Sequence, residues 1–288
     1  MRISTRMFQQ GALASLRRGQ SSLYAAQEQV ASGLRVQTTS DDPQAASRIL
    51  RLNGQLRDVE QYQRNATEAS TRLEAEDTVI TSARKLLDQA RALEISTASG
   101  DPTSPDRDAA LEALEQIRQQ LVSLGNTRVG NEYLFGGGCT TSPPFRPDGT
   151  YVGDATVRQT EIDAGVVVDT NHTGDQLFSN ALLAIRDLED QLSSGSSQQM
   201  PAAGPALEDV SAQLLAAQTV NGSRLGQVKT SLDMLTSRAA GLGDTRDSLR
   251  SADPTKASVE LLAAQSALER AYAAISKVLS TSLVDYLK

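Results

Sequence analysis

The stretch from residue 43 to about residue 99 contains no proline after Pro43, and an apolar side chain recurs at every seventh position within it. An interior proline breaks a helix, so its absence permits a long one. A sustained seven-residue step is typical of the seam of a left-handed coiled coil or of a long bundle helix. At a rise of 1.5 Å per residue, some 55 residues span roughly 80 Å. The seam comprises Leu52, Val59, Ala66, Leu73, Ile80 and Leu87.

A second long helix is predicted from Ala206 onward, because the same seven-residue step returns there. One position of this seam, Asn221, is polar and is followed by Gly222. An isolated polar residue on a seam can fix the register of a coiled coil, whereas an Asn-Gly pair can equally mark a local break. The sequence leaves both readings open. The seam comprises Leu207, Leu214, Asn221, Val228, Leu235, Leu242 and Leu249.

Shorter amphipathic helices are predicted at the two ends, over residues 8–34 and from Pro254 to the last residue. Asp42-Pro43 and Asp253-Pro254 each have the form of a helix start, with aspartate as the N-cap and proline at the first helical position. The apolar stripes of the end helices either pack on the central helices or pair with each other and with neighbouring subunits. Helices of this kind are marginally stable alone, so some partner is expected.

Between the long helices the sequence changes character. A helix is expected from Ser104 to about Tyr133, then glycine- and proline-rich turns and short β-type runs, with Asp163-Ala164-Gly165 as a hairpin turn. Helix resumes near Leu177, and residues 193–205 form a low-complexity turn. We therefore expect a mainly α protein, an elongated antiparallel bundle or coiled-coil rod, with the terminal helices at one end and a small β insert at the other. The segments are an N-terminal assembly helix (1–42), two halves of a helical rod (43–135 and 177–252), the β insert (136–176) and a C-terminal assembly helix (253–288).

Composition excludes several classes of function. The net charge is −7, from 28 basic and 35 acidic residues, so the chain lacks the basic footprint of a general nucleic-acid binder. One cysteine allows no intrachain disulfide, and one histidine with it provides no multi-ligand zinc site. No run of 18 apolar residues predicts membrane insertion, and no apolar leader predicts a cleaved signal. Cys139 and His172 stand without any catalytic signature and are predicted to be surface-loop residues, so we expect no enzyme, metal or cofactor.

Two short motifs identify a family resemblance. Ser32-Gly33-Leu34-Arg35-Val36, followed by Asp41-Asp42-Pro43-Gln44-Ala45-Ala46, resembles the N-terminal signature of the bacterial flagellin family. The arrangement of helical ends around a variable insert is similar to the plan of that family. The opening Met1-Arg2-Ile3-Ser4-Thr5 and the closing segment from Lys277 to Leu287 resemble the branch that joins the flagellar hook to the filament.

The resemblance implies a structural role in the bacterial flagellum, without enzymatic activity. Such a chain is exported by the flagellar type III apparatus without a cleaved signal and lies outside the cell. It forms a ring of identical copies between the first hook-associated protein and flagellin, after delivery by a flagellar export chaperone. The assembly residues implied on the terminal helices are Leu13, Leu16, Leu23, Val30, Leu268, Tyr272, Ile275, Leu279, Leu283 and Tyr286, and the family motif comprises Ser32, Gly33, Leu34, Arg35, Asp41, Asp42 and Pro43.

Two other readings remain open at the level of sequence. Filament flagellin shares the same end motifs and differs in forming long filaments by itself. A cytoplasmic coiled-coil scaffold would have the same helical seams, but it would be absent from the extracellular flagellum.

Overall fold

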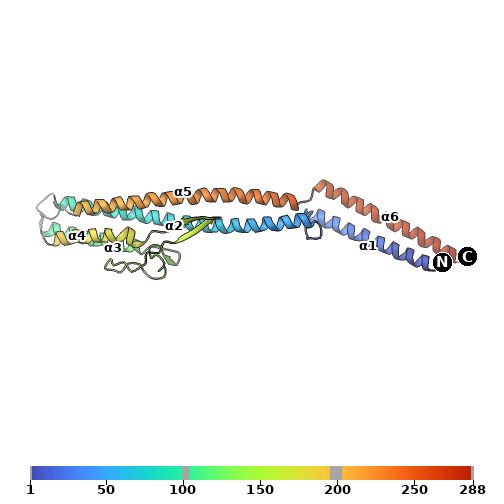
Figure 1. Cartoon of the computed structure of the whole chain (residues 1–288), viewed down its shortest axis with the longest axis horizontal. Coiled ribbons are helices and arrows are strands. Elements are labelled where there is room, and N and C mark those ends of the chain that lie inside the picture. The colour runs from blue at the N-terminus through green and yellow to red at the C-terminus, as the bar shows by residue number, and fades with distance from the viewer. Residues whose placement is uncertain (1, 99–103, 195–202, 287–288) are drawn as a thin grey trace. The chain divides into compact units, whose positions relative to one another are not determined.

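The computed structural model describes residues 2–98, 104–194 and 203–286, with only the backbone described near some of the ends of these ranges. Within these ranges the chain is mainly α-helical (Figure 1). It divides into two compact units. One comprises residues 1–58 and 239–288, and the other comprises residues 59–238. The fold class expected from the seven-residue seams is confirmed.

The long helices are α1 (Arg2–Ser32), α2 (Pro43–Ala98), α5 (Ala203–Arg250) and α6 (Pro254–Tyr286). They end close to the predicted positions, and α2 and α6 begin at the predicted prolines, but α1 begins before the predicted residue 8 and α5 before the predicted Ala206. The Asp42 carboxylate accepts the Ala45 N–H at 2.9 Å and the Asp253 carboxylate accepts the Thr255 N–H at 2.8 Å, so both predicted N-caps form. Between α2 and α5 lie α3 (Ser104–Gly125), the strands β1 (Arg128–Val129), β2 (Glu132–Tyr133), β3 (Gln159–Asp163) and β4 (Val166–Asp169), the π-helical turn η1 (Asp175–Ser179) and α4 (Asn180–Ser193).

The expected helix from Ser104 to about Tyr133 is too long, because α3 ends at Gly125. The ring of Phe145 lies over Gly125 so closely that a Cβ there would meet a ring carbon at 2.6 Å. Asn126 then turns the chain by holding Phe145 through both backbone groups, at 2.9 and 3.0 Å. Gly130 lies in the turn between β1 and β2 with a φ of 61°. Glycine adopts this left-handed conformation readily, whereas most other residues do not.

The core of the 59–238 unit is built from leucine-rich faces of α2, α3, α4 and α5. Three of the four phenylalanines, Phe135, Phe145 and Phe178, are also fully buried there. The ring of Phe178 meets those of Phe135 and Phe145 edge-on, with centroids 5.2 and 5.9 Å apart, an arrangement that aromatic quadrupoles favour. The scarce aromatic residues therefore fasten the loops of the insert to the helices.

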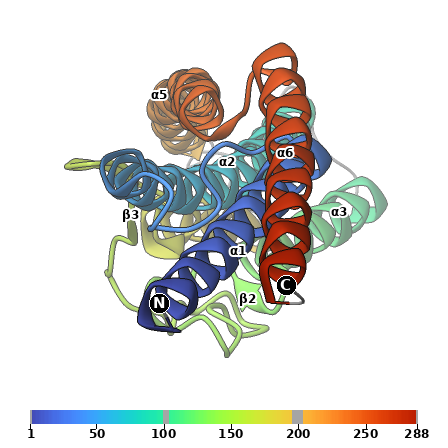
Figure 2. The same cartoon turned by 90° about the vertical axis from the view of Figure 1, so that its right-hand side faces the viewer.

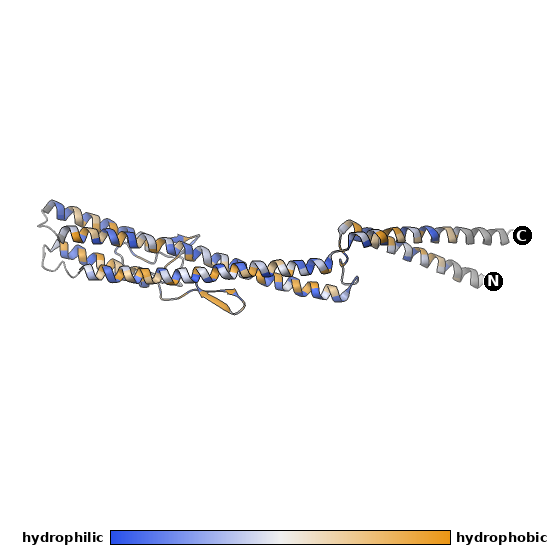
Figure 3. Ribbon diagram, turned by 90° about the horizontal axis from the view of Figure 1, so that it is seen from above, coloured by the Kyte–Doolittle hydropathy of each residue, from blue (hydrophilic) through white to orange (hydrophobic). Residues whose placement is uncertain are grey.

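The predicted hairpin around Asp163-Ala164-Gly165 is confirmed, with β3 and β4 paired antiparallel and the valines of β4 coloured as hydrophobic in Figure 3. Ile162 and Val168 are buried against Ala66, Ala69 and Leu73 of α2 and Val228 of α5. These contacts show which surface of the 59–238 unit the insert covers. The hairpin packs on the sides of α2 and α5, because a two-stranded sheet needs a helical surface to bury its inner face.

Asn221 fixes the register of α2 against α5. Its side chain is fully buried, and its Nδ2 donates to the Leu73 carbonyl of α2 at 2.8 Å. The helix continues through Gly222 without interruption, so the reading of this pair as a break is wrong. Sliding either helix would leave the amide buried without its partner, which is costly.

His172 is not the surface-loop residue that the sequence predicts. Its Nδ1 hydrogen-bonds to the carboxylate of Glu76, whose side chain has no exposed surface. Its Nε2 faces the Arg224 guanidinium at 3.5 Å, and Arg224 in turn binds Asp169 of β4 at 3.1 Å. A buried carboxylate on α2 required a partner, and the insert provides it. Cys139 is exposed, as predicted.

A second polar contact holds the β1–β2 turn to α2. Glu132 accepts from the buried Arg72 at 2.8 Å and from Arg158 at 2.5 Å. Hydrogen bonds from Arg158 and then Arg72 lower the pKa of Glu132 to about 2. The insert is therefore joined to the helices by charged groups as well as by apolar packing.

Candidate interaction surface

The N- and C-terminal helices α1 and α6 pack against each other (Figure 2). Small side chains make this contact possible. A Cβ at Gly19 of α1 would lie 3.1 Å from the Leu268 Cδ1 of α6, so the leucine occupies the space that glycine leaves. Ala26 of α1 and Ala257 of α6 are buried. Close approach of small residues lets two helices bury surface with few large side chains.

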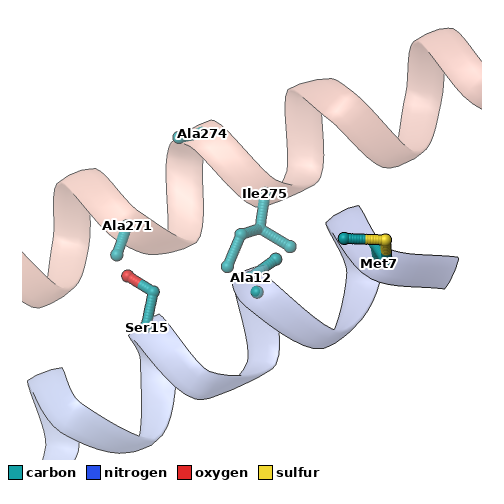
Figure 4. Close-up of a pocket in the computed structure, with 7 residues that line it drawn as sticks. Met7, Ala12, Ser15, Ala271, Ala274 and Ile275 are labelled. Carbon is teal, nitrogen blue, oxygen red and sulfur yellow. The ribbon is translucent and has the colours of Figure 1, made fainter. Parts of the chain in front are cut away.

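A shallow apolar groove runs along this contact (Figure 4). The side chain of Ile275 points from α6 toward Ala12 of α1, with Ser15 beside Ala271. Further along the pair, a second groove has the same small-residue character. The linings are Met7, Gly11, Ala12, Ser15, Ala271, Ala274 and Ile275 for the first groove, and Ser22, Ala25, Ala26, Gln29, Glu260, Ala263, Ala264 and Ala267 for the second.

The structure divides the assembly residues expected from the sequence into two sets. Leu16, Leu23, Leu268 and Ile275 are half-buried. Leu13, Val30 and Tyr272 remain exposed, although the Tyr272 hydroxyl accepts a hydrogen bond from Gln20 of α1 at 3.0 Å. The side chains of Leu279, Leu283 and Tyr286 lie outside the described residues.

Large apolar side chains therefore remain uncovered on both terminal helices. Tyr24 is 71% exposed and Leu13 is 55% exposed on α1, and Leu262 and Val259 of α6 are 62% and 60% exposed. Leu13 and Tyr24 are eleven residues apart, which places them on the same side of α1. Several exposed apolar residues gathered on two paired helices indicate an interaction surface.

The family motif lies where α1 meets α2, and it binds the end of α5. We call residues 32–42 together with residues 249–253 the clasp. Gly33, with a φ of 68°, ends α1 in the left-handed conformation that favours glycine. Its carbonyl accepts the Ala252 N–H at 2.8 Å, and Leu34 pairs with Ser251 as an isolated antiparallel bridge. Ser32 caps the turn by accepting the Leu34 N–H at 3.2 Å.

Arg35 joins the end of α5 to the start of α2. Its backbone N–H donates to the Arg250 carbonyl at 2.7 Å. Its guanidinium donates to the Leu249 carbonyl and to the Asp42 carboxylate, both at 2.9 Å. Cations near a helix C-terminus are favoured by the orphan carbonyls there, so Arg35 acts as a cap for α5.

Asp41 and Asp42 have separate tasks in the clasp. The Asp41 carboxylate accepts the N–H groups of Thr38 and Gln37, which lowers its pKa. The Asp42 carboxylate accepts the Ala45 N–H and binds Arg35, and these contacts lower its pKa. Pro43 begins α2 directly after this cap. The motif therefore serves chain turning and helix capping, as the sequence indicates for Asp42.

Two parts of this surface were not found from the sequence. The small residues of α1 were overlooked in favour of its leucines, although their spacing by three and four is visible at Ala12, Ser15, Gly19, Ser22 and Ala26. The acceptors on α5 are backbone carbonyls, for which a sequence contains no signal.

The described parts of the chain contain no candidate membrane span or metal site. No helix there has the length and hydropathy needed to cross a membrane. No group of three or more His, Cys, Asp or Glu side chains in those ranges is placed to hold a metal ion.

The region that matches a known protein family includes the family motif at residues 32–43. Residues 3–140 match the family model for the bacterial flagellin N-terminal helical region. This match, over slightly less than half of the chain, shows that residues 3–140 are similar to the N-terminal helical region of bacterial flagellins. The expectation drawn from the Ser-Gly-Leu-Arg and Asp-Asp-Pro motifs is thereby confirmed.

Among known relatives, the chain is similar to flagellar hook-associated protein 3 of Escherichia coli strain K12. The two are 31% identical over 182 residues, which is 62% of this chain and 57% of that protein. The match thus spans less than two thirds of the relative's length.

Solved structures show the same fold. Bacillus cereus FlgL has a TM-score of 0.62 and 21% identity, over 68% of this chain and 99% of that one. The flagellar junction protein FlgL of Legionella pneumophila has a TM-score of 0.59 and 15% identity, over 71% of this chain and 100% of that one.

Proposed function

We propose that this chain is a structural subunit of the bacterial flagellum and forms the junction between the hook and the filament. The observation that carries this proposal is the paired terminal helices, which leave large apolar side chains such as Tyr24 and Leu262 uncovered. A flagellin-type chain with such a surface is suited to assembly rather than to catalysis. The similarity to hook-associated protein 3 favours the junction over the body of the filament.

In this proposal identical copies associate side by side into a ring. A ring requires each copy to present two different surfaces, one to each neighbour. The exposed residues of α1, Leu13 and Tyr24, provide one such surface, and Val259 and Leu262 of α6 provide another. Docking buries these side chains, each with a gain of about 1.5–3 kcal/mol for full burial.

The remaining expectations concern partners and location. We propose that the ring binds the first hook-associated protein on one side and flagellin on the other. The subunit is exported through the flagellar type III apparatus, with a flagellar export chaperone as its partner before export, and acts outside the cell. No enzymatic step, metal or cofactor forms part of this proposal.

Localisation tests the proposal most directly. Cys139 is exposed and is the single cysteine of the chain, so a maleimide–gold label on cells marks this protein when other surface thiols are absent. We expect label at one point between hook and filament, and none on a Cys139→Ser control. Label along the whole filament would assign the chain to filament flagellin instead, and its absence from flagella would favour a cytoplasmic scaffold.

A second experiment tests the assembly surface. The variant Leu13→Ser/Tyr24→Ser removes exposed apolar surface without disturbing the α1–α6 contact, and Gln10→Ser/Gln27→Ser on the exposed surface of the same helix is the matched control. We expect the first variant to be exported but not incorporated, while the control assembles. Incorporation of both variants at equal levels would show that this face of α1 is not the assembly surface.

A further inference from the structure

Helices α2 and α5 lose their buried core over one matched stretch. On α2 the buried positions stop at Ala46 and resume at Val59, and on α5 the last buried residue is Leu235. Between these limits the inward-facing leucines, including Leu52, Leu56 and Leu242, are only half-buried. We call residues 47–58 and 239–248 the soft segment.

The soft segment also contains glycines that no contact explains. Gly54 of α2 and Gly241 and Gly243 of α5 lie inside continuous helices, and a Cβ at any of them would have no neighbour within 4 Å. None of the three has a positive φ. Glycine inside a helix lowers helical stability relative to alanine, and here neither packing nor turn geometry requires it.

The glycines of the two helices lie at the same level. Gln63 of α2 donates to Thr236 of α5 at 3.4 Å, and Asn221 of α5 donates to the carbonyl of Leu73 on α2. Continuing this antiparallel register toward the start of α2 places Gly54 level with about residues 240–245, which include Gly241 and Gly243. Both helices are therefore weakened at one place.

The adjoining clasp, in contrast to the soft segment, is held together by hydrogen bonds between its two parts. Its two strands of chain are joined by the hydrogen bonds of Gly33 and Arg35, the isolated bridge of Leu34 and the Arg35 guanidinium contacts. Polar side chains in the soft segment instead bond within their own helix, as Arg51 does with Ser47 and Arg246 with Asp247.

We propose that the soft segment is a bending joint built into α2 and α5, and that the loops of the clasp are not the joint. Local helix opening at Gly54 and at Gly241 and Gly243 is favoured, because few buried contacts oppose it. The clasp moves as a piece with α1 and α6. This property belongs to the free chain and does not depend on the junction role.

Hydrogen–deuterium exchange on the full-length chain tests the joint. We expect amides of 47–58 and 239–248 to exchange faster than those of 62–73 and 224–235. The variant Gly54→Ala/Gly241→Ala/Gly243→Ala should slow exchange in the soft segment by about fivefold or more. Gly222→Ala/Gly226→Ala is the matched control, because these α5 glycines also face open space but lie beside the buried core. This control should leave exchange in the soft segment unchanged.

Two results would overturn the proposal. Equal protection of the soft segment and of residues 62–73 would show that the helices are not weakened there. Faster exchange in residues 33–42 than in residues 47–58 would make the clasp loop the joint instead.

A distance measurement provides a second readout. In a Cys139→Ser background, spin labels at positions 44 and 61 flank the soft segment on α2, and labels at 71 and 88 span the same number of residues of the packed part. All four positions are exposed. We expect a broader distance distribution for the first pair, narrowed by the triple alanine variant. Equal widths for the two pairs would contradict bending.

Discussion

Replacing His172 with alanine tests whether the insert is held by its buried hydrogen bond to Glu76. His172 provides the hydrogen bond to one oxygen of the Glu76 carboxylate, and the other oxygen has no hydrogen-bond partner within the described residues. The Glu76 side chain is 0% exposed, while that of His172 is 14% exposed. The substitution therefore leaves a buried carboxylate with neither oxygen bound by the protein.

The expected cost follows from this geometry. Removing one partner of a buried pair typically costs about 3–5 kcal/mol, because the remaining charge is uncompensated. The partial exposure of His172 admits water to the vacated space, so we expect the lower end, about 3 kcal/mol. Glu76→Gln removes the charge and should cost about 1 kcal/mol. In the Glu76→Gln background, His172→Ala should cost much less unfolding free energy than it does in the unchanged chain, because no buried charge is left.

Urea unfolding measures these costs. A fluorophore on Cys139 reports on the 59–238 unit, which matters because a chain with two compact units need not unfold in one step. The double-mutant cycle of Glu76→Gln and His172→Ala gives the coupling between the two groups. A loss of unfolding free energy below about 1 kcal/mol for His172→Ala would refute the reasoning. So would a His172→Ala loss that is the same size in the Glu76→Gln background as in the unchanged chain.

Three further outcomes are expected. Because the pKa of Glu132 is lowered from 4.5 to about 2 in the folded chain, its stabilising contribution is complete above about pH 4.5 and is lost as the pH falls toward 2. Glu132→Gln should therefore flatten the dependence of urea midpoint on pH between 2 and 5, and an unchanged slope would contradict this. Asn221→Leu should alter the free energy of unfolding by less than about 1 kcal/mol. It should also reduce the yield of a disulfide between cysteines placed at 63 and 236, because the register is no longer fixed; undiminished yield would argue against that role. Gly33→Ala should lower stability by about 1 kcal/mol through backbone strain alone, seen as a lower thermal midpoint, whereas Gly11→Ala, at an equally open helical position, should not.

Most of the helical architecture was predictable from local signals. Seven-residue seams and proline positions indicated α2, α5 and the starts of α2 and α6, because helix periodicity and capping are properties of neighbouring residues. The hairpin of β3 and β4 was found for the same reason, from a turn between two β-type runs. The motif of residues 32–43 predicted the family model that residues 3–140 match, since its residues act within a few positions of one another.

Contacts between distant residues were decided only in the folded chain. The end of α3 at Gly125 depends on the Phe145 ring, twenty residues away in sequence, and the burial of Glu76 depends on His172, almost a hundred residues away. Arg35 finds its acceptors in the backbone of α5, whose carbonyls look alike in any sequence.

The sequence by itself determined that this chain forms long helices and that its N-terminal part is similar to that of the flagellins. The tertiary structure alone decided which faces remain exposed, where the insert is attached and where the two long helices lose their core. The physical reason is that periodicity specifies which side of a helix is apolar, whereas burial depends on what other part of the chain reaches that side.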